Sequence, residues 1–214
     1  MIPWNQDEIL NTLAQAEALD LLKGGKHGLE RETLRTNPDG TLALTPHPRG
    51  MSDPFTDSEI TTDFSESQLE FITAPHDSVE AAVESLTQIH KRAVDTLEND
   101  ELLWPSSMPC ILPAHEDIPV AEYGDDPKAQ EKEIYRNGLA NRYGKYVQTL
   151  CGVHYNMSFS DDLWSFLHQK FGSEETLQSF KNESHLGLVR NFIRKRWLLA
   201  YLLGATPLRH ESYR

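Results

Sequence analysis

Apolar positions recur at helical spacing in several stretches of the chain. The strongest stripe runs from 79 to 97 and is opened by Asp77 or Ser78, either of which suits the cap of a first turn. Pro127 fits the first turn of a helix that ends at Gly144. The spacing also predicts helices over 5–23, ended by Gly24-Gly25, over 160–172 and over 184–203.

Other stretches alternate with a period of two and predict strands. These are 27–36 and 41–45, joined by a turn at 37–40, then 60–64, 68–73 and 145–159. The elements form no regular alternation of strand and helix, which favours an α+β fold with an antiparallel sheet.

The long alternating stretch predicts one apolar face and one polar face. We expect Val147, Val153, Tyr155 and Met157 to lie in the core and the face with His154 to meet a site or solvent. In the last helix the inward positions should be Leu186, Val189, Ile193, Trp197, Ala200 and Tyr201.

Composition and charge narrow the class of protein. Hydrophobic residues make up 38% of 214 and charged residues 25%, which permits a real core. A formal charge of −13 argues against a nucleic-acid partner, because proteins that bind nucleic acids present Lys and Arg to phosphates.

The cysteines and the apolar runs bear on where the protein is located. Cys110 and Cys151 fit two buried thiols in a reducing cytoplasm. No signal peptide or membrane span is expected, and the apolar run 197–205 reads as a buried helix end.

The candidate chemistry begins with Glu30 and Glu32, which point to the same side of a strand. Two carboxylates that close repel each other unless a cation lies between them, and Mg²⁺ is a hard, oxygen-seeking choice. A solvated strand face is the alternative.

A second acidic group follows at Asp63 and Glu70. Their odd spacing would place them on opposite faces of one strand, but the polar residues 65–67 permit a bend or bulge through which they converge. His154 shares a face with Gln148 and Asn156, and a neutral imidazole beside carboxylates can bind a metal. An outward-facing Glu70 and a structural His154 remain alternatives.

The familiar nucleotide and protease motifs are absent from the sequence: there is no GxxxxGK[ST], GxGxxG, HExxH or GxSxG. The sequence therefore favours a carboxylate-rich sheet that binds nucleotide phosphates through metal ions. These ions would screen the negative charge in phosphoryl transfer.

An ordered set of motifs resembles the bacterial glutamate–cysteine ligase family of the gamma-proteobacterial type. The matching stretches are GLERETLR at 28–35, DGTLA at 39–43, ITTDFSESQLEFIT at 60–73, WPSSMPC at 104–110, IYRNGLANRYG at 134–144, QTLCGVHYNMSFS at 148–160 and VRNFIRKRWLLAYLLGATP at 189–207. The resemblance implies a glutamine-synthetase-like antiparallel sheet with outer helices, incomplete in this chain.

The resemblance also implies a reaction. ATP phosphorylates the γ-carboxylate of L-glutamate, and the amine of L-cysteine attacks the acyl phosphate, which is the first step of glutathione biosynthesis. Mg²⁺ or Mn²⁺ is the implied cofactor and ATP the co-substrate. By position, the resemblance implies that the metal ligands are Glu30, Glu32, Asp63, Glu70 and His154. Phe64, Tyr135 and Leu139 would line the cysteine pocket, Gln148 and Asn156 would hold polar substrate groups, and Arg136 would meet phosphate.

The resemblance ends near residue 207, and 208–214 is expected to be a divergent tail after an amino-terminal catalytic part at 1–207. Family members are longer, so a complementing carboxyl-terminal half is an expected partner and the chain alone is expected to be inactive. The alternatives are a non-catalytic fragment that binds a partner or a metal–nucleotide, and a related ligase with another amine.

Overall fold

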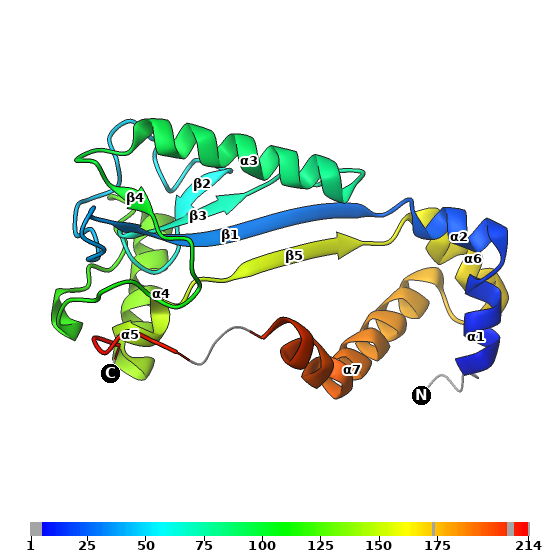
Figure 1. Cartoon of the computed structure of the whole chain (residues 1–214). Coiled ribbons are helices and arrows are strands. Elements are labelled where there is room, and N and C mark those ends of the chain that lie inside the picture. Colours follow the sequence, from blue (N-terminus) through cyan, green and yellow to red (C-terminus); the bar gives the residue numbers. More distant parts are fainter. Residues whose placement is uncertain (1–5, 173, 205–207, 214) are drawn as a thin grey trace. The chain divides into compact units, whose positions relative to one another are not determined.

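The computed structural model of the chain describes residues 6–172, 174–204 and 208–213. These divide into two compact units (Figure 1). We call the part with residues 27–156 and 208–213 the sheet unit, and the part with residues 6–26 and 157–204 the helical unit. The expected boundary at 207 and the start of the first helix at residue 5 lie outside the described residues.

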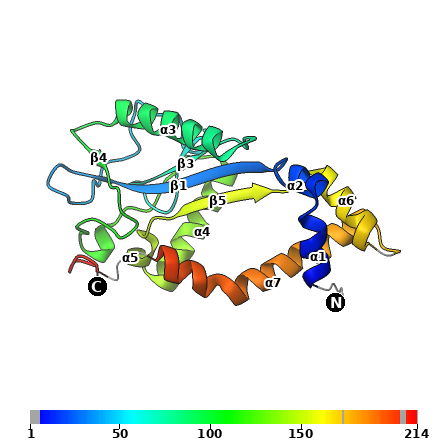
Figure 2. The same cartoon turned by 45° about the vertical axis from the view of Figure 1, so that its right-hand side comes forward.

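One five-stranded sheet organises the sheet unit. Its strands are β1 (Lys26–Thr36), β2 (Ile60–Thr62), β3 (Gln68–Ile72), β4 (Leu102–Leu103) and β5 (Val153–Ser158). Their order is β2-β3-β1-β4, and β5 pairs with β1. β1 is antiparallel to both β3 and β4, and the arrows of β1 and β5 run in opposite directions (Figure 2). The antiparallel sheet and the α+β class expected from the sequence are therefore confirmed.

The two faces of this sheet differ in character. α3 (Val79–Thr96) packs on one face, where Leu69 and Phe71 meet Ile89 and Ala93 in a core cluster. The opposite face of β1 carries Glu30, Glu32 and then Leu34, which belongs to a second core cluster with Phe64, Cys110, Leu112, Ile118 and Cys151. The carboxylates thus lie on the face turned away from α3, beside a dry core.

Capping residues explain where the sheet-unit helices begin. Ser78 Oγ accepts from Ala81 N at 3.1 Å, and Asp126 Oδ1 accepts from Lys128 N at 2.8 Å. The second cap precedes Pro127 and opens α4 (Pro127–Tyr143), which ends at Gly144 with φ +83°. Both predicted helix starts and the predicted stop are confirmed. A 3₁₀ turn, His115–Asp117, lies against α5 (Lys145–Gln148).

The helical unit contains α1 (Gln6–Leu13), α2 (Ala16–Leu22), α6 (Asp161–Phe171) and α7 (Leu177–Leu203). The single helix predicted over 5–23 is wrong, because Gln15 adopts an extended conformation and separates α1 from α2. α7 begins earlier than predicted because the Thr176 hydroxyl caps it. No described helix is long and apolar enough to cross a membrane.

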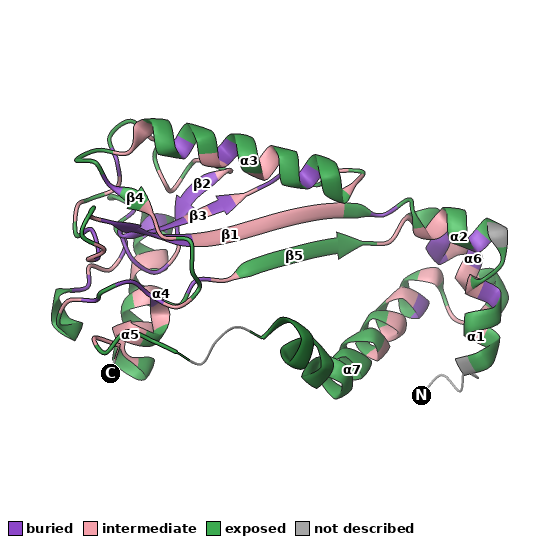
Figure 3. Cartoon of the chain, in the orientation of Figure 1, coloured by how far each residue is buried: buried purple, intermediate pink, exposed green. Residues whose placement is uncertain are grey.

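The predicted strand over 145–159 is wrong in its first half. Residues 145–148 form α5, and Thr149 Oγ1 donates to Tyr146 O to close the following turn. The prediction that its apolar face lies in the core is also wrong for β5, which is exposed along its whole length (Figure 3). Val153, for example, is 63% exposed. The predicted strand at 41–45 is reduced to isolated bridges, Thr36 with Leu42 and Thr41 with Ile111.

The inward face predicted for the last helix is also wrong. Among its described residues only Phe180 is buried, and the carboxyl-terminal part of α7 is exposed (Figure 3). Trp197, for example, is 63% exposed. The apolar side chains of α7 from 188 to 203 are therefore exposed within the described residues, although the sequence pattern is typical of a buried helix.

Candidate functional site

Glu32 on β1 and Glu70 on β3 are directly opposite each other across the sheet. The backbone N–H of Glu32 donates to Gly152 O on the other side of β1, at 3.0 Å. Glu32 and Glu70 are consequently a non-hydrogen-bonded pair, the arrangement in which antiparallel side chains come closest. Like charges in that position are destabilising, so this pair needs a proton or a cation between its members.

Glu30 holds two side chains of β5. Its Oε1 accepts from Asn156 Nδ2 at 2.7 Å, and its Oε2 lies 3.0 Å from His154 Nδ1. The contact with Glu30 uses His154 Nδ1 and leaves the other ring nitrogen, Nε2, free of that carboxylate. A Cβ added to Gly152 would lie 3.3 Å from Nε2, so the glycine keeps the space beside this nitrogen open. Glu32 is fixed by a backbone donor, because Gly152 N reaches its Oε2 at 2.7 Å.

Asp63 joins the group through a hairpin. β2 and β3 are antiparallel, Thr61 is opposite Glu70, and Asp63 N donates to Gln68 O at 3.1 Å. The odd spacing of Asp63 and Glu70 is therefore compatible with one site, since Asp63 directly follows β2 and Glu70 lies on β3. The bend expected at 65–67 is the turn of this hairpin.

Arg136 on α4 brings a positive charge to the same place. Its Nε donates to Asp63 O, and its Nη2 lies 4.0 Å from Asp63 Oδ1. The guanidinium also lies over the ring of Tyr123, 4.9 Å from the centroid. The Tyr123 hydroxyl donates to Thr62 O at 2.6 Å, which fixes that ring against the end of β2.

The electrostatics show an excess of negative charge. Burial, followed by the charges of Asp63, Glu32 and Glu30, raises the pKa of Glu70 to about 7. Burial also raises the pKa of Glu32, despite the Gly152 hydrogen bond, and the pKa of Asp63, despite Arg136. Glu32, Asp63 and Glu70 therefore have too little positive charge around them to ionise together at their ordinary pKa values.

The donor set fits a hard divalent cation, because it consists of carboxylate oxygens with one imidazole. Within the described ranges, no three His, Cys, Asp or Glu side chains close on a single point as a metal cage. The raised pKa values and the position of Glu32 directly opposite Glu70 on the neighbouring strand are the observations that support a cation here.

For several predicted substrate residues, no hydrogen bond or ion pair between their side chains and the carboxylates is found within the described part of the chain. Phe64 is 1% exposed and packs in the core cluster with Leu34, and Leu139 packs against that cluster. Tyr135 is 65% exposed on α4. Gln148 ends α5, so the prediction that it shares a strand face with His154 is wrong, whereas Asn156 is on β5 and touches Glu30.

The sequence reasoning missed Gly152, Tyr123 and Lys132. Gly152 is important because its backbone N–H and its lack of a side chain serve Glu32, and a single glycine gives little signal in a sequence. Lys132 precedes Arg136 by one helical turn on α4, so that spacing could have suggested a pair of cations facing one way.

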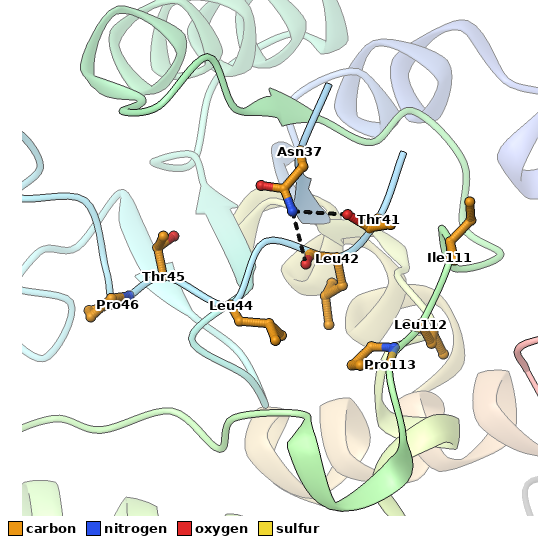
Figure 4. A pocket seen from close by; sticks show the side chains of 9 residues that line it. All are labelled: Asn37, Thr41, Leu42, Leu44, Thr45, Pro46, Ile111, Leu112 and Pro113. Carbon is orange, nitrogen blue, oxygen red and sulfur yellow. Dashed lines mark hydrogen bonds between the residues drawn. The ribbon is translucent and has the colours of Figure 1, made fainter. Parts of the chain in front are cut away.

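A separate hollow of about 690 Å³ lies in the sheet unit away from these carboxylates (Figure 4). The nine residues that line it are apolar or uncharged, and Asn37 Nδ2 is already bonded to Thr41 Oγ1 at 2.9 Å. This lining offers volume but no charged group for chemistry on phosphates or carboxylates.

Comparison with known sequences gives consistent matches. Residues 10–214 match the family model described as glutamate-cysteine ligase. The glutamate–cysteine ligase of Clostridium acetobutylicum is 45% identical over 210 residues, which are 98% of this chain and 44% of that protein. That of Janthinobacterium sp. is 48% identical over 198 residues, 92% of this chain and 37% of that protein. The chain spans less than half the length of these curated relatives.

Two solved structures are similar in fold. Glutamate–cysteine ligase from Francisella tularensis, in complex with AMP, is 36% identical with a TM-score of 0.82, covering 89% of this chain and 37% of that one. A bifunctional glutathione synthetase from Pasteurella multocida is 37% identical with a TM-score of 0.83, covering 94% of this chain and 25% of that one.

Proposed function

Because the chain belongs to the glutamate–cysteine ligase family, we propose that its sheet unit supplies part of a ligase active site. The proposed reaction joins the γ-carboxyl of L-glutamate to the amine of L-cysteine with ATP as co-substrate, as the first step of glutathione biosynthesis. A carboxylate is a poor acyl donor, so phosphorylation by ATP first supplies a leaving group, and the amine then displaces phosphate from γ-glutamyl phosphate.

The observation that carries this proposal is the opposed pair Glu32 and Glu70, surrounded by Glu30, Asp63 and His154 on one sheet face. Carboxylates of this kind are of use in phosphoryl transfer when they hold cations that meet the phosphate oxygens. The proposed cation is Mg²⁺ or Mn²⁺, which would supply charge stabilisation to the transferred phosphoryl group. The residues named here would hold it.

The chain's own polar groups would then orient the substrates. Arg136, held by Asp63 and the Tyr123 ring, offers its remaining donors to a phosphate oxygen. Asn156 fixes the Glu30 carboxylate and keeps an amide oxygen for a substrate amine or ammonium. The cysteine-pocket roles of Phe64, Tyr135 and Leu139 and the role of Gln148 stay predictions.

A further part of the proposal is a complementing carboxyl-terminal half, present in the longer relatives. Exposed apolar side chains on β5 and on α7 support it, because surfaces of this kind usually meet another polypeptide. The alternatives are a fragment that binds without turnover and a ligase for another amine. A cytoplasmic location, suggested by free buried Cys110 and Cys151, stays a prediction.

The test is a chimera of this chain followed by the carboxyl-terminal remainder of the Clostridium acetobutylicum relative. Phosphate release should require ATP, Mg²⁺, glutamate and cysteine together. We expect Glu30→Ala and Glu70→Ala to lower the rate by about tenfold to 100-fold, because each removes a group that holds the cation. Glu80→Ala on the exposed surface of α3 is the matched control and should leave the rate unchanged.

Normal rates in folded Glu30→Ala and Glu70→Ala chimeras would refute the cation-holding role. Turnover by the 214-residue chain alone would refute the need for a second half. A faster rate with another amino acid than with cysteine would favour the alternative amine.

A further inference from the structure

Lys132 on α4 has unusual surroundings for a half-buried cation. Its Nζ lies 4.8 Å from the ring centroid of Tyr123 and 5.6 Å from that of Phe55. Within the part of the chain that the structure describes, no carboxylate forms an ion pair with this ammonium. Contacts with ring faces stabilise the charge but use none of its N–H donors as conventional hydrogen bonds.

Arg136, one turn further along α4, provides the contrast. It lies over the same Tyr123 ring, but its guanidinium is already committed to the backbone oxygen and carboxylate of Asp63. It also reaches Lys132 O with Nη1, at 3.5 Å. The two cations are therefore held side by side by one aromatic ring, and only Lys132 keeps its full set of donors.

Two neighbouring charges act on the Lys132 ammonium, one from Arg136 and one from Glu70. Burial and then the charge of Arg136 lower the pKa of Lys132, while the charge of Glu70 opposes that change. The Tyr123 ring beneath this ammonium carries a hydroxyl that donates to Asp63 O at 3.0 Å, so Lys132 lies beside the Asp63 end of the carboxylate group. An anion bound between Lys132 and Arg136 would reduce the repulsion between these two cations, while a divalent cation would offset the excess negative charge of the carboxylates.

We propose that Lys132 is an anion-binding residue of the site, and that its ammonium, stacked on Tyr123 and Phe55 beside Arg136, receives a phosphoryl oxygen. The identity of the anion as a phosphoryl group rests on the proposed function, whereas the anion site itself rests on the contacts of Lys132. Lysine suits this task because it acts as a point charge with donors that rotate freely.

A substrate carboxylate shares the same chemistry and must be separated by experiment. A phosphoryl group carries more charge and more acceptor oxygens than a carboxylate, so it can satisfy Lys132 and Arg136 together. The orthogonal probes are inorganic phosphate for the phosphoryl group and L-glutamate for the carboxylate.

The test uses the 214-residue chain and its variants Lys132→Met, Lys132→Arg and Lys128→Met. Lys128 is the matched control, because it is an exposed lysine in the first turn of the same helix. Calorimetry measures the affinities for Mg²⁺ alone, for inorganic phosphate with and without Mg²⁺, and for L-glutamate. Circular dichroism checks that each variant is folded.

Lys132→Met should weaken phosphate binding by about tenfold, the loss of one charge-assisted hydrogen bond, and leave Mg²⁺ affinity equal or higher. Lys132→Arg should keep most of the phosphate affinity, and Lys128→Met should match the wild type. A tenfold loss for L-glutamate with none for phosphate would overturn the phosphoryl assignment. Unchanged affinity for both, or no phosphate binding by the wild type, would overturn the anion site. Failure of the proposed function would appear separately, as a chimera without turnover.

Discussion

Replacement of Arg35 by methionine is expected to lower the free energy of unfolding by about 3–5 kcal/mol, because it leaves a buried carboxylate without its partner. Arg35 Nη1 lies 2.6 Å from Glu101 Oε2, and both side chains are 1% exposed. The same guanidinium donates to Thr45 O, Pro46 O and Glu66 O, so it also connects two loops of the sheet unit. Urea unfolding followed by circular dichroism measures the loss.

An exposed ion pair supplies the control. Arg92 pairs with Glu59 at the surface, where both side chains are more than one third exposed, so Arg92→Met should cost less than about 1 kcal/mol. If Arg35→Met fails to fold, the double variant Arg35→Met/Glu101→Leu should recover stability because neither charge is then buried alone. Equal losses for Arg35→Met and Arg92→Met would contradict the role of burial.

Glu70→Gln is expected to stabilise the metal-free chain at pH 8 by about 1–2 kcal/mol. The pKa of Glu70 in the folded chain is about 7, above its ordinary 4.5, so the folded protein binds this proton more tightly than the unfolded chain does. Stability from this group is complete below pH 4.5 and is lost as the pH rises through 7. Solvent around the half-buried carboxyl keeps the effect below the full value of the pKa difference, about 3 kcal/mol.

Unfolding curves at pH 4 and pH 8 measure this effect. The gain in Glu70→Gln over the wild type should be present at pH 8 and vanish at pH 4, where the wild-type carboxyl is already protonated. Glu80→Gln, on an exposed position of α3, should show no such dependence. A Glu70→Gln variant less stable than the wild type at pH 8 would show that the ionised carboxylate is stabilised in the fold.

The elements that could be predicted from the sequence have strong local signals. The helix opened by Ser78 and the helix between Asp126 and Gly144 are set by caps and a glycine stop, which act within one turn. The pairing of Glu30 with Glu32 on one face follows from strand geometry alone. Their meeting with Glu70 depends on which strands are neighbours, and the family resemblance supplied that information.

The failures have a common physical cause. Hydrophobic periodicity predicts that a face is covered, but it does not identify the partner that covers it. β5 and α7 have apolar faces that read as core, yet Val153 and Trp197 are exposed within the described residues. Lys132 was missed because its meaning depends on the rings of Phe55 and Tyr123, which are distant in sequence.

The carboxylate face thus costs stability in the metal-free chain, as expected where groups are arranged for a ligand rather than for folding. The central claim is that a divalent cation relieves that cost. The direct measurement is thermal unfolding at pH 8 during titration with Mg²⁺ or Mn²⁺, for the wild type and for Glu32→Gln/Glu70→Gln. We expect the cation to stabilise the wild type by about 2.7 kcal/mol at 100 times its dissociation constant, and to leave the double variant unchanged. Equal shifts in both proteins, or no shift in the wild type, would contradict the claim.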